Sequence, residues 1–172
     1  EVTKLSLYLK LLENESKESE GYLFKHSDFK LLPSLDDNIK CGNSLIGSDF
    51  YKDKDLSLFG NEEMRKVNVF DWEKEFPGVF KNDGFDVVIG NPPYFNIQTL
   101  GVGSEDAQYI MNKYSDIWQD KSDILFYFIH KAISISKGSV GYIISNAFLF
   151  ADKAQKLRNY IYKKLLFRPL YL

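Results

Sequence analysis

The sequence predicts an α/β protein in which a parallel sheet is flanked by helices. Two apolar runs rich in β-branched residues, at 85–90 and 139–145, are typical of buried parallel strands. An apolar helical pattern at 122–136 lies between them, and a strand–helix–strand order gives parallel strands. A chain of 172 residues with 44% hydrophobic content is long enough for one domain with a substantial core.

The first half of the chain is predicted to hold short elements separated by polar segments. We expect a helix at 2–14, a charged link at 13–20, an ambiguous segment at 21–36, a strand at 37–42, a turn at 43–45, an irregular segment at 46–66 with a short helix around Glu62 to Lys66, and a helical piece from Phe70 to Phe80. The last piece is interrupted at Pro77-Gly78, because proline removes a helical hydrogen bond.

The second half is predicted to be more regular. The strand at 85–90 is followed by a long irregular stretch at 95–121, the helix at 122–136 and the strand at 139–145. Gly138 is expected to stop the helix. A basic helix at 150–166 completes the order, so the segment pattern favours a parallel sheet.

Charge and cysteine content narrow the class of protein. The net charge of −2 does not indicate nucleic-acid binding, although residues 151–172 hold six Lys and Arg against Asp152 alone. This basic helix either faces phosphates or is a solvated surface, and both alternatives stay open. Cys41, the single cysteine, excludes an internal disulfide. No apolar run approaches the ~18 residues of a membrane span, so a cytoplasmic protein is expected.

Asn91-Pro92-Pro93-Tyr94 directly follows the strand predicted at 85–90. The two prolines end the strand and fix an extended turn at its carboxyl end, where ligands bind in open α/β sheets. The turn offers an amide side chain, a free backbone carbonyl and an aromatic ring. These groups suit a planar amino group held between two acceptors and stacked on a ring. The pattern therefore predicts methyl transfer to an exocyclic nitrogen, and favours that of adenine.

The turn resembles motif IV of the S-adenosylmethionine-dependent amino-methyltransferases. The segments 39–46 (Ile-Lys-Cys-Gly-Asn-Ser-Leu-Ile), 70–77 (Phe-Asp-Trp-Glu-Lys-Glu-Phe-Pro) and 84–86 (Gly-Phe-Asp) precede it in an order similar to that of bacterial type IIG restriction-modification enzymes and related phage-defence adenine methylases. The resemblance covers nearly the whole chain. It implies a partial Rossmann-like class I methyltransferase fold, S-adenosylmethionine as cofactor, and double-stranded DNA with a flipped-out target adenine as substrate.

The resemblance gives each residue of the turn a role. The side-chain oxygen of Asn91 and the main-chain carbonyl of Pro92 would accept from the two hydrogens of the amino group, with Pro93 holding the turn rigid. Tyr94 would stack on the extruded base, and this role needs only a ring face, so phenylalanine should replace it. The alternative is that Asn91 caps a turn and the prolines merely stiffen it.

Four further residues are candidates for the cofactor site. Asn43 and Ser44 follow the strand predicted at 37–42 and resemble the motif III position that contacts the amino group of the cofactor's adenine. Leu125 and Phe126 are candidates for its apolar wall. The alternatives are a turn-forming asparagine and plain helix core. No metal site is predicted, and a structural role is expected for Asp71, Trp72, Asp86, His26, His130 and Cys41.

We expect the chain to be part of a longer enzyme. It begins inside a helical pattern, and Gly101-Val102-Gly103 follows no strand, so this segment is a loop rather than a cofactor cradle. By the resemblance, motif III lies near 39–46, motif IV at 91–94 and later motifs at 122–150. Motifs I and II and a target-recognition domain would lie outside the chain. Alone, the chain is expected to be inactive and prone to self-association.

Two other functions compete with adenine methylation in DNA. Methyltransferases that act on protein glutamine or on RNA share the four-residue turn. A non-catalytic piece used only for DNA docking is the other alternative.

Overall fold

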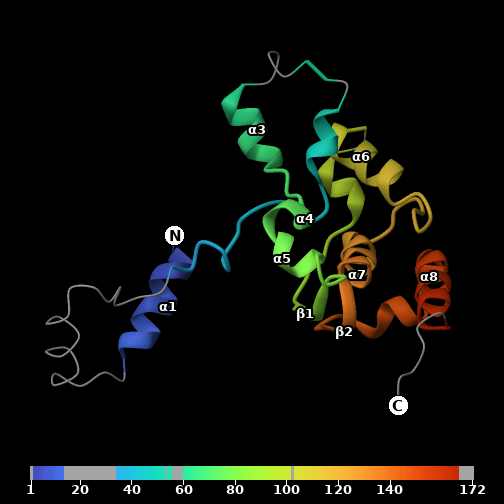
Figure 1. Ribbon diagram of the computed structural model, residues 1–172. Coiled ribbons are helices and arrows are strands. Elements are labelled where there is room, and N and C mark those ends of the chain that lie inside the picture. The colour runs from blue at the N-terminus through green and yellow to red at the C-terminus, as the bar shows by residue number, and fades with distance from the viewer. Residues whose placement is uncertain (1, 14–33, 53, 56–59, 102, 167–172) are drawn as a thin grey trace, which may run out of the picture. The chain divides into compact units, whose positions relative to one another are not determined.

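The computed structural model describes residues 2–13, 34–52, 54–55, 60–101 and 103–166 (Figure 1). The chain divides into two compact units, residues 1–41 and 42–172. Each unit is described by itself.

The first unit contains helix α1, Val2–Leu12, which confirms the helix predicted at 2–14. Lys4 forms an ion pair with Asp36, and Lys10 pairs with Glu13. The predicted link and most of the ambiguous segment lie outside the described residues. The strand predicted at 37–42 is wrong, because residues 36–38 form a turn and no ladder follows. A strand needs a neighbour for its hydrogen bonds, and the described pairing here is a single bridge from Asn43.

A β–α–β arrangement forms the centre of the second unit. Strand β1, Phe85–Gly90, is followed in this arrangement by helix α7, Ile124–Ile135, and strand β2, Ser136–Tyr142. The two strands are parallel, with Val88 opposite Val140 and Gly90 opposite Tyr142. This arrangement confirms the predicted α/β class and places the carboxyl ends of both strands at one edge.

Gly138 does not stop α7 as predicted. The helix ends at Ile135, and Ser136 is already extended with φ −97° and ψ 132°, so β2 begins earlier than expected. A Cβ at Gly138 would lie 2.0 Å from the carbonyl oxygen of Asp86. The glycine is therefore required by the close approach of the two strands.

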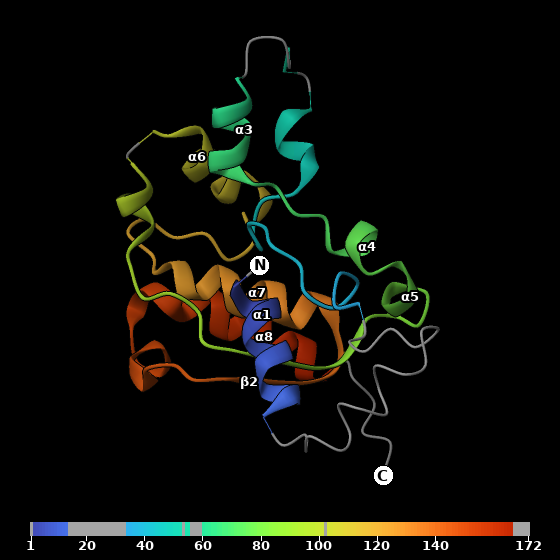
Figure 2. The same cartoon turned by 90° about the vertical axis from the view of Figure 1, so that its left-hand side faces the viewer.

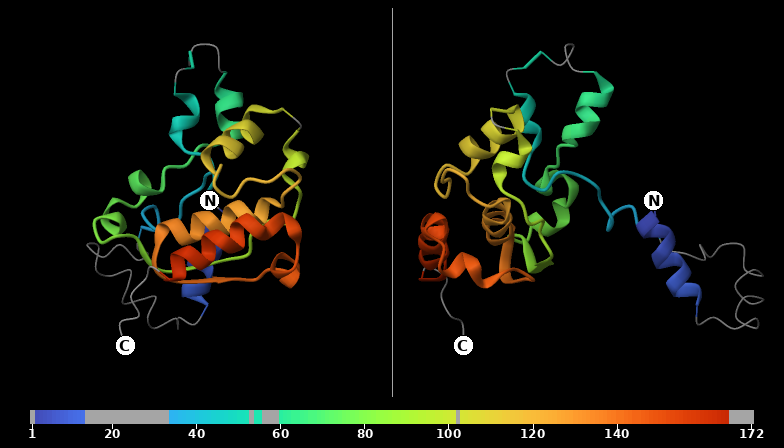
Figure 3. Two further views of the ribbon diagram at one scale, coloured as in Figure 1. Left: turned by 90° about the vertical axis from the view of Figure 1, so that its right-hand side faces the viewer. Right: turned by 180° about the vertical axis from the view of Figure 1, so that it is seen from behind.

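The strands are less buried than their composition predicts. No residue of β1 is fully buried, and the side chains of Val87 and Ile89 are 59% and 80% exposed. Burial of a parallel strand requires cover on both faces. In the second unit the described sheet has two strands, and α7 packs against it on one side. Helix α8, Gln155–Leu166, runs beside α7 (Figures 2 and 3).

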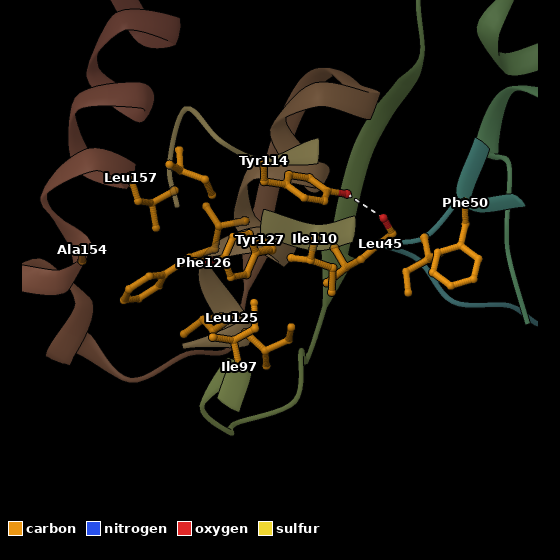
Figure 4. Packing of buried hydrophobic residues seen from close by; sticks show 14 residues of the cluster. Leu45, Phe50, Ile97, Ile110, Tyr114, Leu125, Phe126, Tyr127, Ala154 and Leu157 are labelled. Carbon is orange, nitrogen blue, oxygen red and sulfur yellow. Dashed lines mark hydrogen bonds between the residues drawn. The ribbon is translucent and has the colours of Figure 1, made fainter. Parts of the chain in front are cut away.

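The hydrophobic core lies around α7 rather than on the sheet (Figure 4). Tyr114 and Tyr127 are almost inaccessible, and each hydroxyl has a partner. Tyr114 donates to the Leu45 carbonyl at 3.1 Å, and the Tyr127 hydroxyl lies 2.6 Å from the Ser122 hydroxyl. The core also contains Ile46, Phe50, Ile97, Ile110, Ile117, Ile124, Leu125, Phe126, Ile129, Ala154 and Leu157.

The stretch at 95–121 is more regular than predicted. It contains the 3₁₀ helix η3, Ile97–Leu100, and helix α6, Glu105–Lys113. Ser104 caps α6, since its hydroxyl accepts from the Ala107 backbone N–H at 3.2 Å. A cap followed by acidic residues in the first turn is a helix start signal, but here it lies within a polar segment whose overall pattern predicts an irregular stretch.

Shorter helices complete the second unit. They are η1, Ser48–Tyr51; α3, Asn61–Val67; α4, Trp72–Glu75; α5, Pro77–Phe80; η4, Asn146–Leu149; and η5, Asp152–Ala154. The predicted break near Pro77 is confirmed, because Pro77 begins α5. Trp72 and Phe76 make edge contacts with the ring of Phe85, at 5.8 and 5.4 Å between ring centroids, and join this segment to β1. Among the described helices, none has both the length and the apolar character to cross a membrane.

Candidate active site

The predicted catalytic turn begins where β1 ends. The Ile143 backbone N–H donates to the Gly90 carbonyl at 3.1 Å, so pairing with the second strand continues up to the residue before Asn91. Pro92 is buried, whereas Asn91 and Pro93 are exposed. The buried proline fixes the turn to the sheet and leaves the Asn91 side chain in solvent.

Tyr94 is held by its hydroxyl. That hydroxyl donates to the Ile143 carbonyl at 2.5 Å and lies 3.4 Å from Asn91 Oδ1. The residue is 52% exposed, so a large part of the ring faces solvent. The phenol thus connects the turn to the chain after β2, a contact that the sequence did not predict.

The Pro92 carbonyl is available as an acceptor. Among the described residues, no N–H or O–H donates to it. Two acceptors of different kinds, this carbonyl and the Asn91 amide oxygen, are therefore offered by adjacent residues.

A cavity of about 230 Å³ lies beside the turn. Asn91, Pro92 and Pro93 line it together with Ser44. The indole N–H of Trp72 donates to the Ser44 carbonyl at 3.1 Å. The remaining lining residues are Trp72, Val88, Ile89, Gly90, Phe128, Lys131, Ile135 and Tyr142. The structure therefore brings one of the four predicted cofactor residues, Ser44, to the predicted catalytic turn.

Asn43 stabilises the local fold through its backbone and its side chain. Its backbone N–H donates to the Asn68 carbonyl at 2.7 Å, and it forms a parallel bridge with Val69. Its side-chain oxygen accepts from the Leu45 backbone N–H at 3.1 Å, which closes the turn predicted at 43–45. A carbonyl oxygen has a second lone pair, so the cofactor role stays a prediction.

Leu125 and Phe126 lie in the core. They are 3% and 4% exposed, and neither lines the cavity beside Asn91. Asp123 caps their helix by accepting from the Leu125 backbone N–H at 3.0 Å. The structure thus shows the packing alternative for both residues, and their cofactor role stays a prediction.

A larger cavity of about 490 Å³ shares Trp72, Lys131 and Ile135 with the first. Its wall holds Asp71, which accepts from the Ser48 backbone N–H at 2.8 Å and from Lys74 at 2.6 Å. Burial alone would raise the pKa of Asp71, but the hydrogen bonds from Lys74 and Ser48 outweigh it and lower the pKa to about 2. Asp71 therefore stays ionised and, as predicted, structural.

Lys131 borders both cavities and was missed by the sequence reasoning. Burial, followed by the positive charge of Lys113, lowers the pKa of its ammonium group. Its Nζ lies 5.7 Å from the centre of the Tyr114 ring. The signal that marks it is a lysine, next to His130, within the largely apolar sequence of α7.

The basic helix is partly used for internal contacts. Arg158 donates to the carbonyls of Phe148 and Ala151 at 2.9 and 2.7 Å, and Lys156 donates to the Trp118 carbonyl at 2.9 Å. Lys153, Lys163 and Lys164 are exposed, and Arg168 lies outside the described residues. Both alternatives for this helix therefore stay open.

Among the residues that the structure describes, the other polar candidates form no second site. His130 Nε2 lies 3.0 Å from Asp116, and its ring stacks on Tyr160 with 4.2 Å between centroids. Cys41 is exposed, and His26 lies outside the described residues. In the part of the chain that the structure describes, no cluster of three His, Cys, Asp or Glu side chains is arranged to hold a metal ion.

Comparison with known proteins supports the resemblance. Residues 1–170 match the family described as Eco57I restriction-modification methylase. The chain belongs to this family. It is also 35% identical over 159 residues to the type II restriction enzyme and methyltransferase RM.Eco57I of Escherichia coli, a match that covers 90% of the chain. The predicted relationship to a restriction-modification methyltransferase is thereby confirmed.

A second relative comes from an archaeon. The chain is 32% identical over 111 residues, or 63% of its length, to the putative type II restriction enzyme and methyltransferase RM.MjaORFECS2P of Methanocaldococcus jannaschii. The matched segments span 14% of the first relative and 9% of the second. This Eco57I-family chain thus corresponds to a small part of each relative.

Proposed function

We propose that the chain carries the catalytic turn of a DNA methyltransferase, which transfers a methyl group from S-adenosylmethionine to the N6 amino group of adenine in double-stranded DNA. The parent would be a type IIG restriction-modification or phage-defence protein. The observation that carries the proposal is the turn itself: Asn91 and Pro92 offer adjacent acceptors at the carboxyl end of β1, beside a cavity and a solvent-exposed aromatic ring.

The two acceptors address the main difficulty of the reaction. The lone pair of the adenine amino nitrogen is delocalised into the ring, which makes the amine a poor nucleophile. Hydrogen bonds from its two hydrogens to Asn91 Oδ1 and the Pro92 carbonyl favour the pyramidal nitrogen of the transition state. Acceptors already held by the fold need no reorganisation during the reaction. The site therefore acts by position and electrostatics, without a strong base.

The described residues would contact only part of the cofactor. S-adenosylmethionine would supply an activated methyl group on a sulfonium, and Asn43 and Ser44 would contact its adenine end. Ser44 lies in the cavity beside Asn91, which supports this part. The cavity of about 230 Å³ falls below the ~300–1,000 Å³ typical of sites for drug-sized ligands. The described residues therefore fit one end of the cofactor, within a Rossmann-like fold of which β1, α7 and β2 would be part.

The target base would be methylated after it has left the DNA duplex. An enzyme that acts on a base within duplex DNA must flip it out, at a cost of a few kcal/mol. Stacking on one aromatic side chain returns roughly 1–3 kcal/mol. Tyr94 is the exposed ring next to the two acceptors, so it is the stacking candidate.

The test is an acceptor panel with the full-length enzyme that contains this chain. Duplex DNA, single-stranded RNA and a glutamine-containing protein extract would each be incubated with cofactor labelled in its methyl group. The products are digested and identified by mass spectrometry. We expect N6-methyladenine from duplex DNA. Label in methylglutamine or in RNA would favour the two competing methyltransferases, and no label with any acceptor would favour the DNA-docking alternative.

A further inference from the structure

The Tyr94 hydroxyl has two neighbours and one proton. Its oxygen lies 2.5 Å from the Ile143 carbonyl and 3.4 Å from Asn91 Oδ1. Both neighbouring atoms are oxygen acceptors, and a hydroxyl donates a single hydrogen. The Ile143 carbonyl takes that hydrogen, because at 2.5 Å it lies much nearer to the hydroxyl than Asn91 Oδ1 at 3.4 Å.

The Asn91 carboxamide is then better placed the other way round. Half a turn about its last side-chain bond exchanges Oδ1 and Nδ2 without moving the rest of the residue. Nδ2 would then face the phenol oxygen and donate to its free lone pair. Oδ1 would face away from the phenol, toward the solvent in which Asn91 is exposed. In this series of hydrogen bonds, from Asn91 through Tyr94 to Ile143, each donor would then face an acceptor.

We propose that Tyr94 is a positioning residue as well as a stacking ring: its hydroxyl donates to the Ile143 carbonyl, accepts from Asn91 Nδ2, and so turns Asn91 Oδ1 toward the amino group that is methylated. This inference rests on the proposed function, because the outward oxygen matters only if it accepts from that amino group. Ile143 is well placed for this task, since its own N–H is bonded to Gly90, the last residue of β1. Ile143, the residue after β2, is thereby joined both to the end of β1 and to Tyr94 in the turn.

Tyr94→Phe in the full-length enzyme separates the two roles of Tyr94. The phenylalanine ring still stacks, so base extrusion, followed by the fluorescence of 2-aminopurine at the target position, should be unchanged. Stacking alone predicts that phenylalanine can replace Tyr94, whereas a positioning role predicts that the single-turnover methylation rate falls by about tenfold, which corresponds to one hydrogen bond, while KM for DNA stays constant. Tyr94→Ala should lose the fluorescence signal as well. Tyr162→Phe, at an exposed tyrosine of α8, is the matched control and should change nothing.

Asn91→Asp tests whether the hydroxyl acts through Asn91. A carboxylate presents an acceptor on both sides, so its orientation no longer depends on a neighbour. Adding Tyr94→Phe to Asn91→Asp should therefore lower the rate by less than about twofold, a strong departure from additivity. If Asn91→Asp abolishes turnover, the Tyr94→Phe measurement decides alone.

The outcomes distinguish this inference from the proposed function. A wild-type enzyme that methylates no adenine overturns the proposed function. With an active wild type, the inference is overturned if Tyr94→Phe keeps the full rate, if the rate and the fluorescence fall together, or if Tyr94→Phe has the same effect with Asp at position 91.

Discussion

At the residue scale, the candidate site depends on side chains whose partners lie far away in the sequence. Trp72 holds the Ser44 carbonyl, and Asp71 holds the Ser48 backbone N–H. Both residues had been expected to be structural, and the contacts show what they support. Trp72 attaches the segment after α3 to the turn that contains Ser44 and forms part of the wall of the cavity beside Asn91. Asp71 attaches the same segment to Ser48 in η1 and lies in the wall of the larger cavity.

Asp71→Asn should therefore destabilise the protein. The amide still accepts from Ser48 but loses the ion pair with Lys74, so we expect a loss of roughly 1 kcal/mol in the free energy of unfolding at neutral pH. Because the pKa of Asp71 is lowered to about 2 in the fold, its stabilisation is complete above the usual value of 3.8 and disappears as the pH falls toward 2. Urea unfolding of both proteins across this range measures the effect, and a constant difference down to pH 2 would disprove the assignment.

At the element scale, β1, α7 and β2 form the frame that places the turn. Their existence follows from local pattern: the β-branched run of 85–90 and the apolar face of 124–135 are long and regular. The start of β2 does not follow from local pattern, because a glycine after a helix usually marks the end of that helix. Here Gly138 serves a long-range contact with Asp86, and only the paired strands reveal it.

Substitution of two glycines in β2 tests this frame. Gly138→Ala places a methyl group 2.0 Å from the Asp86 carbonyl oxygen, so the strands must separate, and we expect a loss of about 2 kcal/mol or more. Gly141→Ala is the matched control, because its added methyl meets Ile89 Cγ2 at an ordinary 3.7 Å. Thermal unfolding of both variants gives the comparison. Equal stabilities would mean that the close approach at Gly138 is unimportant.

The local geometry of the turn at 91–94 follows from the sequence more directly than the arrangement around it. Asn91, Pro92, Pro93 and Tyr94 are contiguous, and two prolines fix their local geometry. Lys131 was not predicted as part of the cavity wall, because the packing of α7 against β1 and Trp72 brings it there. Leu125 and Phe126 were singled out by a resemblance on a helix whose every apolar residue was an equal candidate for the core. Residues that act through distant contacts are the ones that a single sequence leaves unassigned.

At the scale of the whole molecule, the described site covers only part of a cofactor. The cavity beside the turn is small, and Asn43 and Ser44 are the polar candidates for its adenine end. We therefore expect the 172-residue chain alone to bind S-adenosylmethionine weakly and to show no methylation. Titration calorimetry measures the affinity. Micromolar binding by a monomeric sample would contradict this expectation.

The exposed apolar side chains of the sheet predict self-association of the isolated chain. Val87, Ile89 and Ile143 are 59%, 80% and 75% exposed along and just beyond the strands. Exposed apolar strands of this kind pair with other chains. Sedimentation velocity of the chain should show oligomers that increase with concentration, and Ile89→Lys should reduce them. A sample that stays monomeric at high concentration would disprove self-association through these exposed apolar residues.

We propose that the turn after β1 promotes methyl transfer to the adenine amino group. The most direct measurement is the single-turnover rate of N6-methyladenine formation in duplex DNA by the full-length enzyme, with and without Asn91→Ala. Because the lost acceptor acts mainly in the transition state, we predict a fall on the order of 100-fold or more, with DNA affinity unchanged. A variant that forms N6-methyladenine at a rate near that of the wild type would contradict the account.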